Sequence, residues 1–208
     1  MTRRGWLALL GLLPVAAAAI PVLESIERRR RPGTQRPVHG FHRDYFPDLV
    51  LRTQDDERVR LHGDLLEGKT VIVHFFYTDG RDGVCPAVTE NLVQLQRLLG
   101  DRCGRDVFMY SFTLAPAQDT PAQLRKYRDA HRIGPGWTFL TGSAPDLELC
   151  RARFGIADPD PGLDRARSQH TNVVLLGNEP HERWMASPAL APARVLLGRV
   201  DRVAGLKV

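Results

Sequence analysis

Short runs of apolar residues alternate with helical stripes along most of this 208-residue chain. Residues 71–76 form a β-branched and aromatic run, which is typical of a strand buried on both faces. Pro86 suits the first turn of a helix, and four apolar residues follow it at helical spacing: Val88, Leu92, Leu95 and Leu99. The alternation continues with a strand at 107–114, a helix that Thr120 caps and Pro121 begins, a strand at 137–140, a helix from Ser143 toward Phe154, and a strand at 171–176. This order of strand, helix and strand predicts parallel pairing.

Hairpins open and close the pattern. Residues 49–51 and 59–61 flank the polar segment 54–56, which predicts an antiparallel pair at the start. Gly177 and Asn178 predict a turn that leads into a second closing strand at 182–185. A final helix begins at about Pro192 and has three apolar residues on one face: Leu196, Val200 and Val203. A central mixed sheet with helices on both faces is the thioredoxin-like plan, so we predict an α/β, thioredoxin-like fold with an N-terminal β-hairpin.

The amino terminus has a different character. Residues 6–23 are almost continuously apolar and follow Arg3 and Arg4, the order of a signal peptide or a single membrane anchor, and residues 2–7 resemble a twin-arginine export signal. Arginines at 28–31 favour the opposite orientation, so orientation and cleavage stay open. We predict a signal peptide or anchor with a basic flank (1–31), a linker (32–40) and a thioredoxin-like domain (41–208). We expect the domain at a periplasmic or extracytoplasmic face, membrane-tethered or exported.

Composition narrows the class of protein further. Hydrophobic residues make up 43% of the chain and charged residues 25%, which is typical of a globular domain rather than of a polytopic membrane protein. The formal charge of +5 comes almost wholly from arginine, since the chain has only three lysines. Along the domain these arginines are scattered among acidic residues, and the one dense run follows the apolar amino terminus. We therefore expect contact with a membrane through the amino terminus and no nucleic-acid partner.

The chain has three cysteines, an odd number that predicts no disulfide framework. For Cys103 and Cys150 we expect burial as small apolar residues and assign no function. Cys85 lies at the predicted amino terminus of a helix, where backbone N–H groups and the helix dipole stabilise a thiolate. A thiolate is a nucleophile and also a soft metal ligand, so this position suits either thiol redox chemistry or Cu(I) binding.

The segments around Cys85 resemble the Sco/SenC family, thioredoxin-fold copper-delivery factors for cytochrome oxidase assembly. The resemblance begins with residues 75–78 and 82–86, and covers the chain roughly from residue 41 to the carboxyl end. It continues in order through Asp119-Thr120-Pro121, the segment 137–142, Gln169-His170-Thr171 and Gly177-Asn178-Glu179. The individual motifs are short, but their order is specific.

The resemblance implies a copper site made of two loop cysteines, four residues apart, and a distant histidine. Cys85 corresponds to the second cysteine and His170 to the histidine, but Arg81 stands where the first cysteine is expected. Arginine stays protonated, so Arg81 cannot bind a cation and repels one. The family's acidic residue after the second central strand is also replaced, by Ala115. The expected site is therefore incomplete, with copper bound weakly or not at all, and the additional donors we consider are His74, Asp79, Asp82 or water.

Three functions follow from these observations. The first is a copper-binding chaperone or assembly factor for a respiratory oxidase, whose partner is an oxidase subunit or another copper protein and which is not itself a catalyst. The second is a metal-free adaptor that keeps the fold and still docks the partner. The third is a single-cysteine, peroxidase-like redox protein in which Arg81 activates the Cys85 thiol.

Overall fold

A computed structural model describes residues 45–80, 83–157, 160, 164 and 172–206. Contacts divide the chain into two units, residues 1–39 and residues 40–208, and every described residue belongs to the second. In the described part of the chain, no helix is both long and apolar enough to cross a membrane. The predicted signal or anchor (1–31) and linker (32–40) lie outside the described residues.

One mixed sheet of seven strands, in the order β2-β1-β5-β4-β3-β6-β7, organises the domain. The strands are β1 (Val50–Thr53), β2 (Arg58–Arg60), β3 (Thr70–Phe76), β4 (Val107–Thr113), β5 (Trp137–Thr141), β6 (Val173–Asn178) and β7 (Arg183–Pro188). The central strands β3, β4 and β5 are parallel, as predicted, and the other pairs are antiparallel. Because parallel strands end at the same edge of a sheet, the loops that follow β3 and β4 lie side by side.

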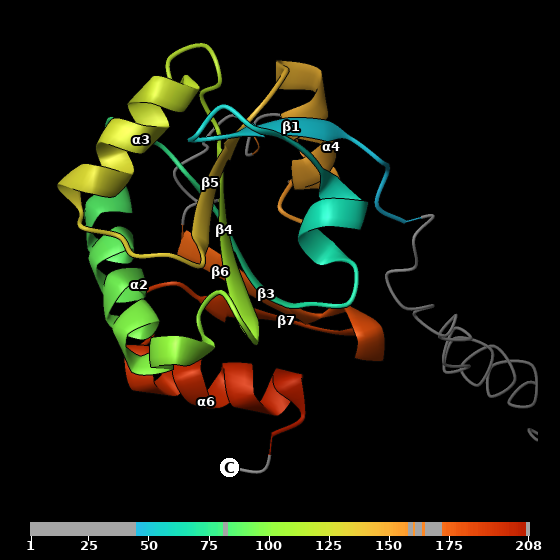
Figure 1. Cartoon of the computed structure of the whole chain (residues 1–208), viewed down its shortest axis with the longest axis vertical. Coiled ribbons are helices and arrows are strands. Elements are labelled where there is room, and N and C mark those ends of the chain that lie inside the picture. Colours follow the sequence, from blue (N-terminus) through green and yellow to red (C-terminus); the bar gives the residue numbers. More distant parts are fainter. Residues whose placement is uncertain (1–44, 81–82, 158–159, 161–163, 165–171, 207–208) are drawn as a thin grey trace, which may run out of the picture. The chain divides into compact units, whose positions relative to one another are not determined.

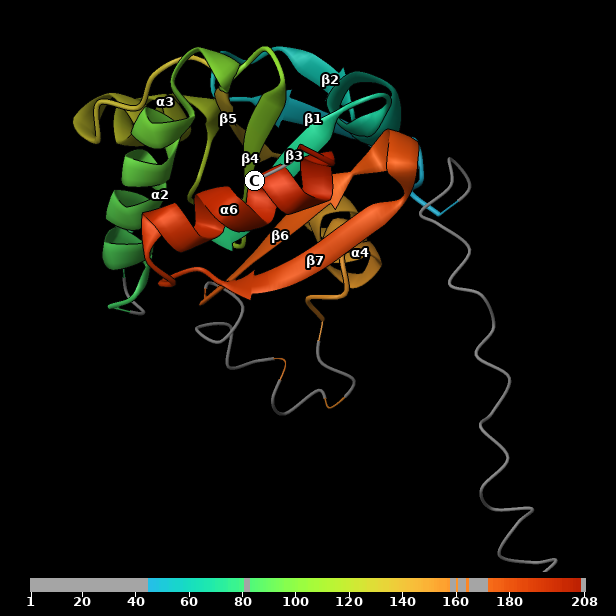
Figure 2. The same ribbon diagram turned by 90° about the horizontal axis from the view of Figure 1, so that it is seen from below.

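Helices cover both faces of this sheet. The longer ones are α2 (Cys85–Leu99), α3 (Pro121–Ala130), α4 (Ala144–Arg153) and α6 (Ala193–Ala204), and the short ones are a π-helix η2 (Leu61–Leu66) and the 3₁₀ turns η3 (Gly100–Arg102) and η5 (Glu179–His181). Figure 1 shows α2 and α3 on one side of the sheet and α4 on the other. Figure 2 shows α6 crossing the ribbon of β6 and β7 on the side of α2. The predicted α/β, thioredoxin-like architecture is confirmed.

Two apolar cores result, one on each face. Ile72 and Phe76 of β3 belong to the core under α2, α3 and α6, whereas Val71, Val73 and Phe75 belong to the core under η2 and α4. This division follows from the alternation of side chains along a strand. The prediction that β3 is buried on both faces is confirmed, since its last six residues are all buried.

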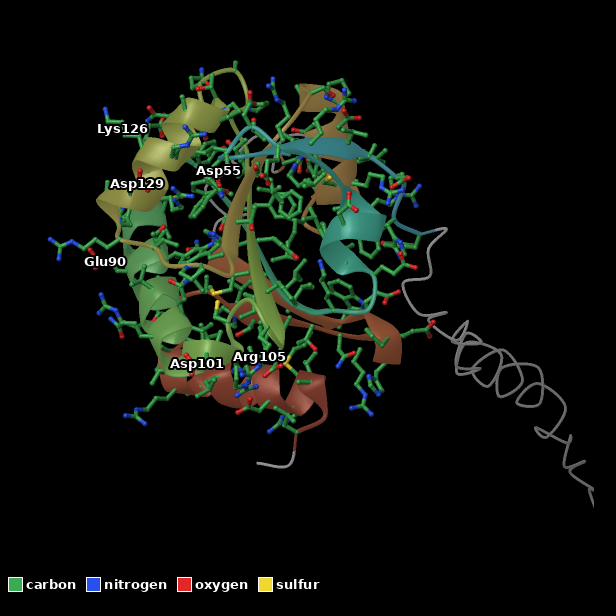
Figure 3. The ribbon with its side chains drawn as sticks, viewed as in Figure 1. Asp55, Glu90, Asp101, Arg105, Lys126 and Asp129 are labelled. Atoms are coloured by element: carbon green, nitrogen blue, oxygen red, sulfur yellow. The ribbon has the colours of Figure 1, made fainter. Side chains whose placement is uncertain are left out.

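The predicted helix starts are confirmed by their caps. The Thr120 side chain accepts a hydrogen bond from the Gln123 amide at 3.4 Å, and the Ser143 side chain accepts one from the Asp146 amide at 3.2 Å. The outer faces of α2 and α3 are polar, and their charged residues Glu90, Lys126 and Asp129 lie on the outside of the ribbon in Figure 3.

The closing hairpin is confirmed, but its predicted turn is wrong. Strand β6 continues through Gly177 and Asn178, and the chain reverses only in η5, which is followed by Glu182 with a positive φ of 52°. Gly177 lies opposite Trp184, whose ring occupies the space that a larger residue would need. The Asn178 side chain accepts the His181 amide at 3.2 Å and caps η5. The two residues that suggest a turn in sequence therefore serve cross-strand packing and capping.

Candidate functional site

Cys85 is the first residue of α2, at the carboxyl edge of the central strands. Cys85 has no solvent-exposed surface and packs in the core under α2, α3 and α6. Val84, the residue that precedes the helix, caps it with no side-chain hydrogen bond, and Pro86 occupies the first turn. The predicted position of Cys85 at a helix amino terminus is therefore confirmed, and this end of α2 places partial positive charge around the sulfur.

The loop between β3 and α2 is closed by a contact between its two ends. The backbone N–H of Tyr77, the first residue after β3, lies 3.4 Å from Cys85 Sγ and donates a hydrogen bond to it. The sulfur is thus oriented by β3 as well as by α2.

A buried carboxylate fixes the same edge of the sheet. Asp119 is 2% exposed, and its two oxygens accept hydrogen bonds from the hydroxyl groups of Thr78 and Thr113. Thr113 is the last residue of β4, and its hydroxyl oxygen also accepts the Ala115 amide at 2.9 Å. The Asp119 amide in turn donates to the Ala115 carbonyl at 2.9 Å. Sequence reasoning assigned Asp119 no role of its own, because only the fold brings it to Thr78.

The described residues include only some of the predicted copper ligands. Arg81, Asp82 and His170 lie outside the described residues, so the Cys85 and His170 copper pair stays a prediction. Among the additional donors, His74 is buried within β3 and Asp79 is exposed in the loop. Across the described ranges, no three His, Cys, Asp or Glu residues are grouped closely enough to hold a metal ion.

The other two cysteines have different surroundings. Cys150 is fully buried in the core under η2 and α4, where burial and, secondarily, the charge of Asp146 raise the pKa of its thiol to about 12. Cys103 is half-buried, and burial raises its pKa while a hydrogen bond from Gln96 opposes the shift. Within the described part of the chain, Cys85, Cys103 and Cys150 form no disulfide. The expected burial is confirmed for Cys150 and is partial for Cys103.

Comparison with known proteins adds family context to this geometry. The SCO1/SenC family matches residues 43–204. A SCO1 protein homolog of Bacillus subtilis is 32% identical over 95 residues, which are 45% of this chain and 47% of that relative. The alignment therefore spans about half the length of that curated relative.

Solved structures agree on the fold. Yeast Sco1 with copper bound superposes with a TM-score of 0.59 at 20% identity, covering 78% of this chain and 96% of that one. BsSco, described as a member of the Sco family of cytochrome c oxidase assembly proteins, has a TM-score of 0.61 at 23% identity, covering 78% and 94%. With the family match across more than half of its length, this chain belongs to the SCO1/SenC family.

Proposed function

We propose that this chain is a copper-binding assembly factor for a respiratory oxidase, in which Cys85 and His170 hold the ion as cargo. The observation that carries the proposal is the position of Cys85 at the amino terminus of α2, with its sulfur turned toward the β3 loop and the Tyr77 amide. Two relatives support the class of function: yeast Sco1 has been solved with copper bound, and BsSco is described as belonging to a family of oxidase assembly proteins.

The donor chemistry fits a copper ion that changes oxidation state. Thiolate sulfur prefers Cu(I), and imidazole nitrogen suits Cu(II). The described strands support the pairing of these two residues. Val174 of β6 lies opposite His74 of β3 in an antiparallel register, so β6 begins at the edge where β3 ends. His170 precedes Val173, the first residue of β6, by only three positions in the sequence.

Arg81 makes this site different from the family pattern. It takes the place of one of the two cysteines, so the chain offers one loop thiolate instead of two. Its permanent positive charge lies four residues before Cys85 and opposes the binding of a cation. We therefore propose that this protein binds copper more weakly than it would with a cysteine at this position.

Copper titration of the purified full-length chain tests the proposal. Cu(I) and Cu(II) affinities are measured by competition with a chelator for the wild type and for Cys85→Ala, His170→Ala and the double variant. We expect each single variant to lose at least about tenfold in affinity, on the scale of lost ligand-supporting interactions at metal sites. Equal affinity of the wild type and the double variant would refute copper binding by these two residues. His181→Ala is the matched control, because His181 lies in η5 at the opposite end of β6.

The metal-free adaptor is the second candidate, and the substitutions at Arg81 and Ala115 favour it. Arg81→Cys separates the two functions. Under the copper proposal, the wild type binds copper and Arg81→Cys binds it more tightly. Under the adaptor proposal, the wild type binds none and only Arg81→Cys does.

The peroxidase-like function is less well supported, because the sequence shows no resolving cysteine at a recognisable spacing from Cys85. Peroxide consumption compared between the wild type and Cys85→Ser tests it directly: equal rates would exclude it.

For location, we propose that residues 1–31 export or tether the domain to an extracytoplasmic membrane face. Fractionation of cells expressing the full chain, with protease added from the outside, tests that assignment.

A further inference from the structure

Asp119 is a buried carboxylate with two side-chain hydrogen bonds, and the copper proposal does not explain either feature. A carboxylate that is 2% exposed is costly to bury unless hydrogen bonds stabilise it, and here two hydroxyl groups do so. One donor, Thr113, is at the end of β4, and the other, Thr78, is in the loop that leads from β3 to Cys85. The carboxylate therefore joins the end of β4 to the loop that follows β3.

This bridge leads directly to the sulfur of Cys85. Thr78 is held on Asp119, and the preceding residue, Tyr77, donates its amide to Cys85 Sγ at 3.4 Å. Thr78 directly follows Tyr77, so only the φ and ψ rotations of Tyr77 separate the Thr78 peptide group from the N–H that Tyr77 donates to the sulfur. On the other side, Asp119 directly precedes Thr120, the cap of α3, so the carboxylate itself is held by a helix start.

We infer that Asp119 is a positioning residue that fixes Cys85 for ligand binding through Thr78 and Tyr77. This inference rests on the proposed copper site, but it also makes a claim about the protein without metal. With the bridge intact, the Tyr77 amide stays on the sulfur and Cys85 stays covered. Without it, Tyr77 and Thr78 move and Cys85 becomes accessible.

Thr78→Val replaces the hydroxyl group that donates to Asp119 with a methyl group of similar size. Thr78 is partly exposed in a loop, so we expect the domain to retain its core. Thr78→Ser keeps a hydroxyl at the same position and serves as the conservative rescue. Thr89→Val is the matched control, since Thr89 is a buried α2 threonine that bonds Tyr127 at 2.8 Å rather than Asp119.

The first experiment measures how fast iodoacetamide alkylates Cys85 and Cys150 in the full-length chain without copper, at one fixed pH, with peptide mass spectrometry as the readout. Both cysteines have no exposed surface, but they lie in different cores. We expect Thr78→Val to accelerate alkylation of Cys85 alone by about tenfold, the ratio that loss of one hydrogen bond to a charged group produces. Thr78→Ser and Thr89→Val should leave the Cys85 rate near the wild-type value.

Two results would overturn the inference. An unchanged Cys85 rate in Thr78→Val means that the bridge does not hold the loop. A parallel rise at Cys85 and Cys150 means that the bridge stabilises the whole domain and positions nothing in particular. Both outcomes are independent of copper, so failure of the copper proposal leaves this test intact.

The second experiment links the bridge to the metal. The sulfur-to-copper charge-transfer absorption of the Cu(II)-loaded chain reports on the geometry of the Cys85 sulfur. We expect Thr78→Val to shift or weaken this absorption and Thr78→Ser to restore it. The same spectrum in all three proteins contradicts a positioning role.

Discussion

The guanidinium group of Arg151 forms a two-pronged pair with the carboxylate of Asp164 while being almost completely buried. Arg151 is 2% exposed, and its Nη1 lies 2.7 Å from Asp164 Oδ1. Its Nε and Nη2 also donate to Glu148, at 3.1 Å and 2.7 Å. The hydrogen bond to Asp164 is the main cause that raises the pKa of Arg151 above its usual value. Arg151 therefore ties Asp164, which lies between α4 and β6 in the sequence, to α4.

Replacing Arg151 with methionine should strongly destabilise the domain. The variant keeps most of the side-chain length but removes the cation from Glu148 and Asp164, whose side chains are 44% and 24% exposed, and the lost hydrogen bonds between charged groups cost about 1.5–3 kcal/mol. Urea unfolding of the two proteins measures the difference. Arg105→Met is the control, because Arg105 pairs with Asp106 at the exposed surface and its loss should leave the midpoint unchanged. Equal midpoints for wild type and Arg151→Met would contradict the assigned role.

Stability should fall at high pH because of Cys150 and Tyr110. Burial raises the pKa of Cys150 from 9.0 to about 12 and also raises the pKa of Tyr110. The unfolded chain releases these protons first, so the stabilisation is complete below about pH 9 and is lost as pH rises toward the folded values, at about 1.4 kcal/mol per pH unit for each group.

Cys150→Ala should reduce the slope of the unfolding free energy against pH between about pH 9 and 10.5. In this range the Cys150 thiol ionises in the unfolded chain but not in the folded domain. Urea unfolding at several pH values measures this slope. Cys103→Ala should reduce it less, since Cys103 is only half-buried. A slope that Cys150→Ala leaves unchanged would show that the buried thiol does not control this range.

Two glycine substitutions should have opposite effects. Gly136 has a φ of +84°, and a Cβ placed on it would lie 2.4 Å from the backbone nitrogen of Gly104. Gly136→Ala should therefore destabilise the domain by more than about 1 kcal/mol, through backbone strain and collision. Gly198 lies in α6 with open space around its Cα, so Gly198→Ala should stabilise by about 0.5–1 kcal/mol. Thermal unfolding of both variants checks the two signs.

The contact between Gly177 and Trp184 should be sensitive to one methyl group. A Cβ on Gly177 would lie 2.4 Å from the Trp184 ring, which packs against Phe46 with ring centroids 5.7 Å apart. Gly177→Ala should displace the ring, shift its fluorescence to longer wavelength and cost about 1–3 kcal/mol. In a Trp184→Leu background the same substitution should cost less. Equal costs in both backgrounds would contradict a steric contact between the two residues.

Much of the fold follows from local patterns. The stripe from Val88 to Leu99 forms the buried face of α2, and Thr120 and Ser143 cap the helices that they were predicted to start. The predicted turn at Gly177 fails because a glycine serves equally well in a turn and beneath an aromatic ring. The π-helix at Leu61–Leu66 begins at a residue assigned to a strand from sequence, since the apolar run there is too short to distinguish the two.

For the site, the sequence by itself determined the types of donor, the presence of Arg81 where a cysteine is expected, and the position of Cys85 at a helix amino terminus. These are local properties, fixed by residue identity and by the spacing of apolar residues. The tertiary structure alone decided that the Cys85 sulfur is buried against the Tyr77 amide, and that Asp119 holds Thr78 from a distance of 41 residues along the chain. The second contact depends on β3 and β4 pairing in parallel, which brings loops far apart in sequence to the same edge of the sheet.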